Sequence, residues 1–239
     1  MGQYRTFRLI LVTAFLVFGA TVWCTEKVAW GQGGRNASFE YGPAESLSQI
    51  LGRPTGDSVT LSVLSASDVE AYVEFGDKKE NYSRKTRTLR SNAGSPFEFE
   101  LERLQPDTRY FYRLYSRQPG QDGFAVGEEY TFHTQRPPGS TFTFALQGDS
   151  HPERVGKMYN PDLYVQTMRN VEKDRPDFYL TMGDDFSLDR LVNRGTLVQS
   201  SVDRVYAHQR SFLGIVGRSS PLFLVNGNHE QAGDNWLDG

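Results

Sequence analysis

Apolar and polar side chains alternate along residues 58–134. Apolar residues occupy every second position over residues 59–63 and again over residues 69–75. Because successive side chains of a strand point to opposite faces, this period of two predicts half-buried β-strands. Further strands are predicted, with Gly, Pro, Asn or Asp between them, at residues 86–89, 97–101, 110–115 and 130–134. Six or seven short strands at this spacing predict an all-β sandwich.

The pattern changes after residues 136–140, whose sequence RPPGS predicts a stiff hinge and a domain boundary. Beyond this hinge, short apolar runs alternate with longer segments of helical periodicity. Three strands are predicted from the apolar runs at residues 141–146, 178–182 and 222–225.

Two helices are predicted between these strands. Asn160 and Pro161 are typical of a helix start, and apolar residues then recur at helical spacing until the sequence DRP at residues 174–176 ends the helix. A second helix is predicted over residues 202–213. The order strand, helix, strand, helix, strand predicts an α/β domain with a parallel sheet.

Composition places the chain among globular proteins and excludes one class of partner. Of its 239 residues, 23% are charged and 13% are aromatic, which is a globular composition. The formal net charge is −3 and the calculated pI is about 5.9. Since binding to a nucleic-acid backbone needs a basic surface, nucleic acid is not expected as the main partner.

The N-terminal segment has the features of an export signal. Arg5 and Arg8 precede an apolar run over residues 9–24, and small residues near position 31 offer a cleavage site. We therefore expect residues 1–31 to be a signal peptide and the mature protein to be extracellular or periplasmic. A membrane anchor is the alternative, although the run is shorter than the roughly 20 apolar residues of a spanning helix, so no stable membrane span is expected in the mature form.

Cys24 is the only cysteine of the chain, and it lies inside this N-terminal segment. Lipidation at Cys24 is a less favoured alternative because the preceding Trp23 is not small. If the segment is removed, no disulfide can stabilise the mature chain. The predicted organisation is then a linker at residues 32–46, a sandwich domain at residues 47–136 and an α/β domain at residues 140–239.

Each predicted strand of the α/β domain runs into a glycine followed by a residue that can bind a metal. The first loop contains Asp149 and His151, the second contains Asp184, and the third contains Asn228 and His229. Because the carboxyl ends of parallel strands meet at one edge of the sheet, we expect these side chains to lie together. A single Gly-Asp turn is weak support for a metal site, whereas three such loops in order are far more specific.

These motifs resemble those of the calcineurin-like metallophosphoesterase superfamily, over about residues 141–239. The similar segments are the sequences GDSH, GDD and GNHE, which begin at Gly148, Gly183 and Gly227. The aromatic segment at residues 104–112, together with the sequences VEFG at residue 73 and FHT at residue 132, resembles the fibronectin type III-like N-terminal domain of purple acid phosphatases. The resemblance implies an α+β chain of two domains, a β-sandwich followed by an incomplete α/β metallophosphoesterase sandwich.

The resemblance also implies a ligand set. Asp149 and His151 would hold a first metal ion, Asp184 would bridge two ions, and Asn228 would hold the second. The implied cofactors are two divalent or mixed-valence ions of Fe, Mn or Zn, which suit a mixed shell of carboxylate, amide and imidazole. A tyrosine-ligated iron is not expected, because Ser187 occupies the family's downstream position.

The catalytic roles implied by the resemblance belong to the third loop. His229 would lie beside the substrate phosphate, and Glu230 would orient the His229 ring by accepting a hydrogen bond. Asp185 is expected to be a solvated carboxylate of the turn. The family's remaining histidine ligands lie downstream of its third motif, so this chain is expected to lack part of the site.

The predicted function is the metal-dependent hydrolysis of a small phosphate ester, either a monoester or a diester. The alternative is a noncatalytic exported binding protein with a truncated and degenerate phosphoesterase domain. If translation ends at Gly239, the strands at residues 178–182 and 222–225 are expected to keep an exposed face or edge. The sandwich domain is expected to supply positioning or rim contacts, because its sequence shows no cluster of acids, bases or nucleophiles.

Overall fold

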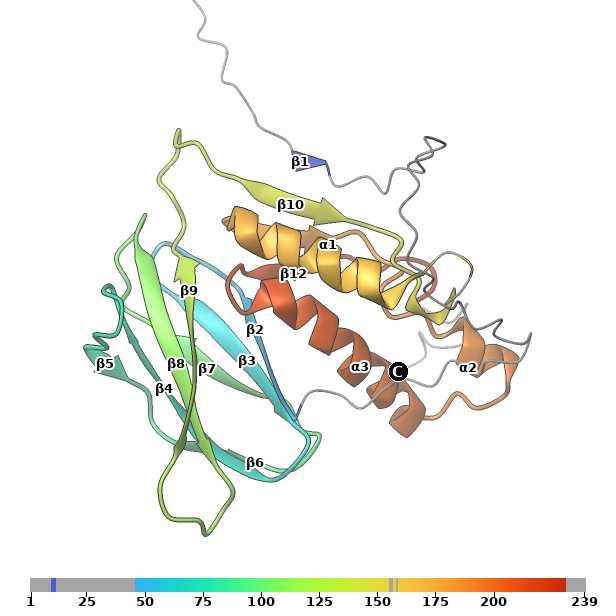
Figure 1. The fold of residues 1–239 in the computed structure, drawn as a ribbon, viewed down its shortest axis with the longest axis horizontal. Coiled ribbons are helices and arrows are strands. Elements are labelled where there is room, and N and C mark those ends of the chain that lie inside the picture. Colours follow the sequence, from blue (N-terminus) through green and yellow to red (C-terminus); the bar gives the residue numbers. More distant parts are fainter. Residues whose placement is uncertain (1–9, 12–45, 155–156, 158, 231–239) are drawn as a thin grey trace, which may run out of the picture.

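The computed structural model describes residues 10–11, 46–154, 157 and 159–230. The expected signal peptide and linker therefore lie outside the described residues, apart from Ser46 and the short strand β1 (Ile10–Leu11). Among the described residues, no helix has both the length and the apolar character needed to cross a membrane. A β-sandwich precedes an α/β unit along the chain (Figure 1).

The sandwich consists of two antiparallel sheets within the described part of the chain. One sheet has the order β2 (Leu47–Gly52), β3 (Val59–Ser65) and β7 (Phe97–Leu101). The other contains β5 (Arg84–Lys85), β4 (Val69–Gly76), β8 (Arg109–Arg117) and β9 (Ala125–His133), with β6 (Leu89–Ser91) also paired to β4. The structure thus confirms the predicted sandwich.

The prediction of one strand at residues 86–89 is wrong. The structure has two short strands there, with β5 ending at Lys85 and β6 beginning at Leu89. Thr86 explains the break. Its backbone N–H donates to Val73 O at 2.9 Å, and its side-chain Oγ1 accepts from Val73 N at 2.9 Å. A hydroxyl therefore takes the place of the backbone carbonyl that a continuous ladder would use.

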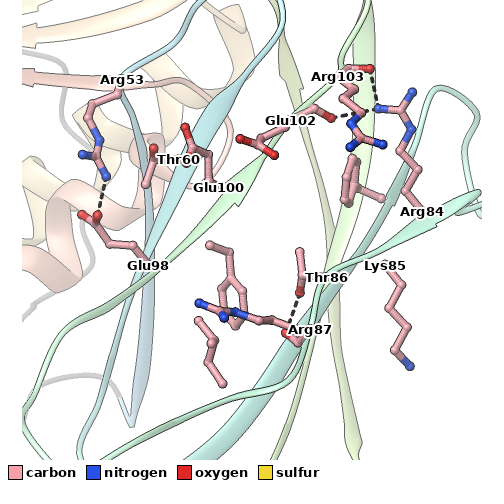
Figure 2. Close-up of a pocket in the computed structure, with 13 residues that line it drawn as sticks. Arg53, Thr60, Arg84, Lys85, Thr86, Arg87, Glu98, Glu100, Glu102 and Arg103 are labelled. Atoms are coloured by element: carbon pink, nitrogen blue, oxygen red, sulfur yellow. Dashed lines mark hydrogen bonds and ion pairs between the residues drawn. The ribbon is translucent and has the colours of Figure 1, made fainter.

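A pocket of about 760 Å³ opens on the sandwich and is lined from both sheets (Figure 2). Its charged lining corrects the expectation that the sandwich has no cluster of acids and bases. The cluster comprises Arg53, Arg84, Lys85, Arg87 and Arg103 with Glu98, Glu100 and Glu102. Arg53 pairs with Glu98, and Arg84 donates to two backbone carbonyls. These two cations are thus held by the sandwich itself, and no histidine lines the pocket.

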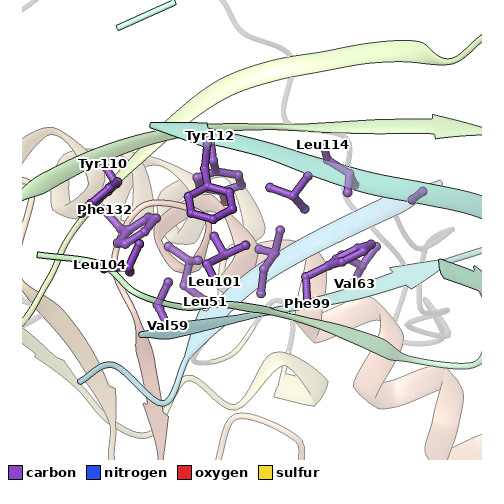
Figure 3. Close-up of a cluster of buried hydrophobic side chains, with 14 of the residues drawn as sticks. Leu51, Val59, Val63, Phe99, Leu101, Leu104, Tyr110, Tyr112, Leu114 and Phe132 are labelled. Atoms are coloured by element: carbon purple, nitrogen blue, oxygen red, sulfur yellow. The ribbon is translucent and has the colours of Figure 1, made fainter. Parts of the chain in front are cut away.

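The sandwich core fills the space between the two sheets (Figure 3). Leu101 and Leu114 are fully buried there, on strands that the alternating pattern predicts, and Leu51 is fully buried on β2, a strand that was not predicted. Tyr110 ties the corner before β8, because its hydroxyl accepts a hydrogen bond from Gln105 N at 2.8 Å. This bond gives the aromatic segment a structural role.

The α/β unit has a parallel sheet. Its strands β10 (Phe144–Gln147), β11 (Phe178–Thr181) and β12 (Leu222–Leu224) follow β1 in the order β1, β10, β11, β12. Helices α1 (Pro161–Asp174) and α3 (Gln199–Gly217) lie side by side against the sheet (Figure 1). The short helix α2 (Asp189–Asn193) and the 3-10 turn η1 (Pro152–Arg154) were not predicted, and α3 is longer than expected.

Helix α1 begins where the sequence predicts. The Asn160 side chain accepts hydrogen bonds from Asp162 N at 3.0 Å and from Leu163 N at 3.2 Å, which satisfies two N–H groups of the first turn. Its buried stripe consists of Tyr164, Met168 and Val171. Met168 contacts the Tyr179 hydroxyl of β11, which places this stripe on the sheet.

The opposite face of the sheet has no helix layer in the described part of the chain. Phe142, Met182, Phe223 and Val225 are each about half exposed there. The Phe178 ring packs near Phe142 and Phe223, so these three rings form one apolar surface. In the described part of the chain, the strands β11 and β12 thus have one exposed face.

Helix α3 also joins the α/β unit to the sandwich. Arg210 donates to Ser48 Oγ and to Ser62 O, both at 2.7 Å. At the end of the helix, the buried Tyr112 hydroxyl of β8 donates to Arg218 O at 2.7 Å. Because these bonds reach both sheets of the sandwich, α3 holds the sandwich against the unit that carries the three candidate loops.

Candidate metal centre

The three loops that follow β10, β11 and β12 lie against one another. Backbone bonds join the first loop to the second, from Asp149 N to Gly183 O at 3.2 Å and from His151 N to Asp184 O at 3.0 Å. The third loop joins the second through a bond from His229 N to Asp184 Oδ1 at 3.1 Å. The parallel register of the strands therefore brings the three sequence motifs to one edge of the sheet.

Two glycines allow this close packing. Gly183 has a φ of +97°, and a Cβ built there would stand 2.5 Å from Gly227 Cα. A Cβ on Gly227 would stand 2.8 Å from Asp184 N, which is also too close. Gly148 differs, because its φ is not in the left-handed region and its nearest neighbour is the flexible end of Met182. The second and third loops thus require glycine more strictly than the first.

The candidate ligands themselves have unusual backbone conformations. Asp149, His151 and Asp184 have φ values of 55°, 45° and 62°, in the left-handed region. Residues other than glycine are held there only when their surroundings fix them, and such conformations cluster at functional sites. The fold therefore imposes a costly backbone conformation at the positions where the sequence predicts metal ligands.

His151 lies between two carboxylates. Its Nε2 is 3.7 Å from Asp149 Oδ1 and 3.5 Å from Asp184 Oδ2. The ring of His229 meets the His151 ring edge to face, with 4.7 Å between their centroids. Potential ligand atoms of His151, Asp184 and His229 all lie within 4.8 Å of one another. Asp149 is open to solvent, since 77% of its side chain is exposed, whereas His151 and Asp184 are buried.

These residues fit a metal ion by the chemistry of their donors. One carboxylate and two imidazoles, those of Asp184, His151 and His229, converge on one small region. The exposed carboxylate of Asp149 lies beside His151, and no cysteine is among these residues. Carboxylate oxygen and imidazole nitrogen together suit Fe, Mn and Zn. Asn228 is exposed, and no hydrogen bond to its side chain is seen within the described residues. Its neighbours Gly227 and His229 contact Asp184, so its backbone lies at the same edge.

Glu230 has a different role from the one the sequence predicts. Its buried carboxylate accepts four backbone N–H groups, so it is not the acceptor for the His229 ring. Oε2 accepts from Asp184 N at 2.9 Å and from Gly227 N at 2.8 Å. Oε1 accepts from Asp185 N at 2.6 Å and from Phe186 N at 2.9 Å. One carboxylate thus fixes the backbone of the second and third loops together.

Asp189 is the partner of the His229 ring, and sequence reasoning missed it. Its Oδ2 lies 2.5 Å from His229 Nδ1. Asp189 is the first residue of α2, a short helix whose sequence has little periodicity. An acidic residue five positions after Asp184 was the available signal, but nothing local to the sequence connects it with a histidine forty residues later.

Asp185 is also placed differently from the expectation of a solvated turn carboxylate. It is fully buried, and Gln147 Nε2 donates to its Oδ1 at 3.2 Å. Burial raises the pKa of Asp185 to about 6. Its side chain therefore belongs to the layer between the sheet and the helices.

The sequence contains two further histidines, His133 and His208. His133 ends β9, and its Nδ1 lies 2.9 Å from Thr134 O. His208 lies on α3 with its ring against Phe212. Neither belongs to the metal-binding group found among the described residues.

Similarity to known proteins is limited to folds. No protein-family model matches the chain, and no curated protein does. A solved structure of PhoD matches with a TM-score of 0.54 and 16% identity, covering 76% of this chain and 38% of the PhoD chain. A fibronectin type III domain of human collagen XX matches with a TM-score of 0.28 and 18% identity, covering 36% of this chain and 86% of that domain. The chain therefore shares a fold with PhoD and spans well under half of its length.

Proposed function

We propose that this chain carries the metal-binding part of an exported phosphoesterase that hydrolyses small phosphate esters. The observation that carries the proposal is the convergence of His151, Asp184 and His229 at the carboxyl ends of three parallel strands, with Asp149 beside His151. The phosphoesterase-type fold of PhoD supports it. The resemblance of the three loops to calcineurin-like metallophosphoesterases, including purple acid phosphatases, gives the finer class.

In this proposal all three loops supply metal ligands. Asp149 and His151 would hold one ion, Asp184 would be shared by two ions, and Asn228 would hold the second through its amide oxygen. The ions, of Fe, Mn or Zn, would polarise the phosphoryl group and activate a water for in-line attack. Glu230 keeps Asp184 in place by holding its backbone N–H.

His229 is assigned to the substrate. Because its Nδ1 faces Asp189, its Nε2 is the ring nitrogen left for the phosphate. There it stabilises negative charge or gives a proton to the leaving oxygen, while Asp189 fixes the ring orientation. This pairing gives His229 a role separate from metal binding. A ring nitrogen of His229 nevertheless lies close enough to the ligand atoms of His151 and Asp184 for the three residues to share an ion.

Metal binding and hydrolysis test the proposal on the purified chain and on any longer form of the protein. We expect Mn²⁺, Fe²⁺ or Zn²⁺ to bind and to be required for hydrolysis of nitrophenyl phosphate or its diester analogue. Asp184→Asn is expected to lose both properties. The same hydrolysis without metal, or an Asp184→Asn variant as active as the wild type, would contradict the proposal. N-terminal sequencing of secreted protein tests export.

A further inference from the structure

A chain of buried polar side chains runs beneath the candidate metal centre, between the sheet and the two helices. Gln209 of α3 is fully buried, and its Nε2 donates to Ser150 Oγ at 3.3 Å and to Tyr164 OH at 3.2 Å. Tyr164 belongs to α1, so one amide group connects two helices to the first loop. Such buried polar networks help to specify one arrangement of the elements that they join.

The network continues to the second loop through β10. Gln147 Nε2 donates to Tyr164 OH at 3.0 Å and to Asp185 Oδ1 at 3.2 Å. Gln147 Oε1 accepts in turn from the Tyr179 hydroxyl. The polar chain therefore ends at two loop residues, Ser150 and Asp185, that lie next to candidate metal ligands in the sequence.

The position of Ser150 gives the network a consequence for the site. Ser150 stands between Asp149 and His151, whose left-handed backbone needs support from its surroundings. The backbone bonds of this loop to the second loop give part of that support. Gln209 supplies a second contact, from the helix side and 59 positions away in sequence.

We propose that Gln209 is a positioning residue of the candidate metal centre. Its hydrogen bond to Ser150 fixes the first loop, and this contact keeps the side chains of Asp149 and His151 directed toward Asp184. This role rests on the proposed function, because it presupposes a metal centre. The anchoring of the first loop by Gln209 can be measured without a metal.

The chemistry of Gln209 makes a clean test possible. Its Oε1 is buried and has no hydrogen-bond partner among the described residues. Replacement by methionine, which has a similar shape, removes two hydrogen bonds and also removes this unsatisfied acceptor. The two effects oppose each other, so Gln209→Met is expected to fold with nearly unchanged global stability while the loop loses its anchor.

The experiment measures amide hydrogen exchange in the chelator-treated full chain. We expect the amide hydrogens of Asp149 and His151 to exchange about tenfold faster in Gln209→Met, because the loss of one hydrogen bond makes local opening of the loop easier. The exchange of sandwich amides should not change. Ser150→Ala should have the same effect, and the double variant should be no worse than either single one. Gln199→Met, on the exposed first turn of α3, is the matched control.

A second measurement is the dissociation constant for Mn²⁺, which should rise about tenfold or more in Gln209→Met and not in Gln199→Met. Unchanged exchange at Asp149 and His151 in a folded Gln209→Met protein would overturn the inference, as would fully additive effects of Gln209→Met and Ser150→Ala. If the wild type binds no metal, the proposed function fails, whereas the exchange rates still decide whether Gln209 anchors the loop.

Discussion

The role of Glu230 leads to the sharpest prediction, because sequence and structure assign it different partners. If Glu230 oriented the His229 ring, Glu230→Gln would keep an acceptor oxygen and cost little stability. In the structure, both carboxylate oxygens accept two backbone N–H groups each. A glutamine can present only one oxygen, so its NH₂ group must face two of these donors.

The cost follows from the number of donors that lose their acceptor. A hydrogen bond to a charged group contributes about 1.5–3 kcal/mol, so two lost bonds correspond to about 3–6 kcal/mol. Relief from burying the carboxylate offsets part of this loss. We therefore expect Glu230→Gln to reduce the free energy of unfolding by at least about 2 kcal/mol, a large share of the 5–15 kcal/mol typical of a domain.

The assay is urea unfolding of the metal-free protein, monitored with separate signals for the sandwich and the α/β unit. We expect the free energy of unfolding to fall for the α/β unit alone, and Mn²⁺ to bind more weakly. Glu128→Gln is the control, because Glu128 is exposed and, among the described residues, accepts a hydrogen bond from the Tyr130 hydroxyl alone. A Glu230→Gln protein as stable as this control, with wild-type metal affinity, would refute the reasoning.

Three further predictions concern the loops. Asp189→Asn should lower kcat for phosphoester hydrolysis about 10- to 100-fold and leave metal affinity unchanged, because the His229 ring loses its carboxylate partner. Steady-state kinetics measure this, with Asp203→Asn as the control, since Asp203 pairs with Gln199 instead. Gly227→Ala should abolish Mn²⁺ binding measured by calorimetry, because the added Cβ would push the second and third loops apart; wild-type affinity would contradict the close packing. Because burial raises the pKa of Asp185 from 3.8 to about 6, its ionisation is disfavoured in the folded state, so stability falls as the pH rises through this range. In metal-free protein, the stability advantage of Asp185→Asn over the wild type should grow by about 2.5 kcal/mol between pH 4 and pH 7 in urea unfolding, and a constant difference would contradict the burial argument.

The sequence by itself determined the features that depend on local periodicity and local hydrogen bonding. Strand β7 begins and ends where the alternation predicts, and α1 begins at the residue after Asn160. The sequence also predicts that the three loops meet, because strands in a parallel sheet present their carboxyl ends at one edge. These signals reside in a few consecutive residues, so they are readable without the fold.

The tertiary structure alone decided which side chains serve the candidate ligands. Glu230 holds the backbone of two loops, Asp189 rather than Glu230 faces His229, and Asp185 points into the core instead of solvent. Gln209 reaches Ser150 from a helix 59 positions away. The physical reason is that burial and hydrogen-bond geometry depend on how distant segments pack, whereas residue type and spacing state only what each side chain could do.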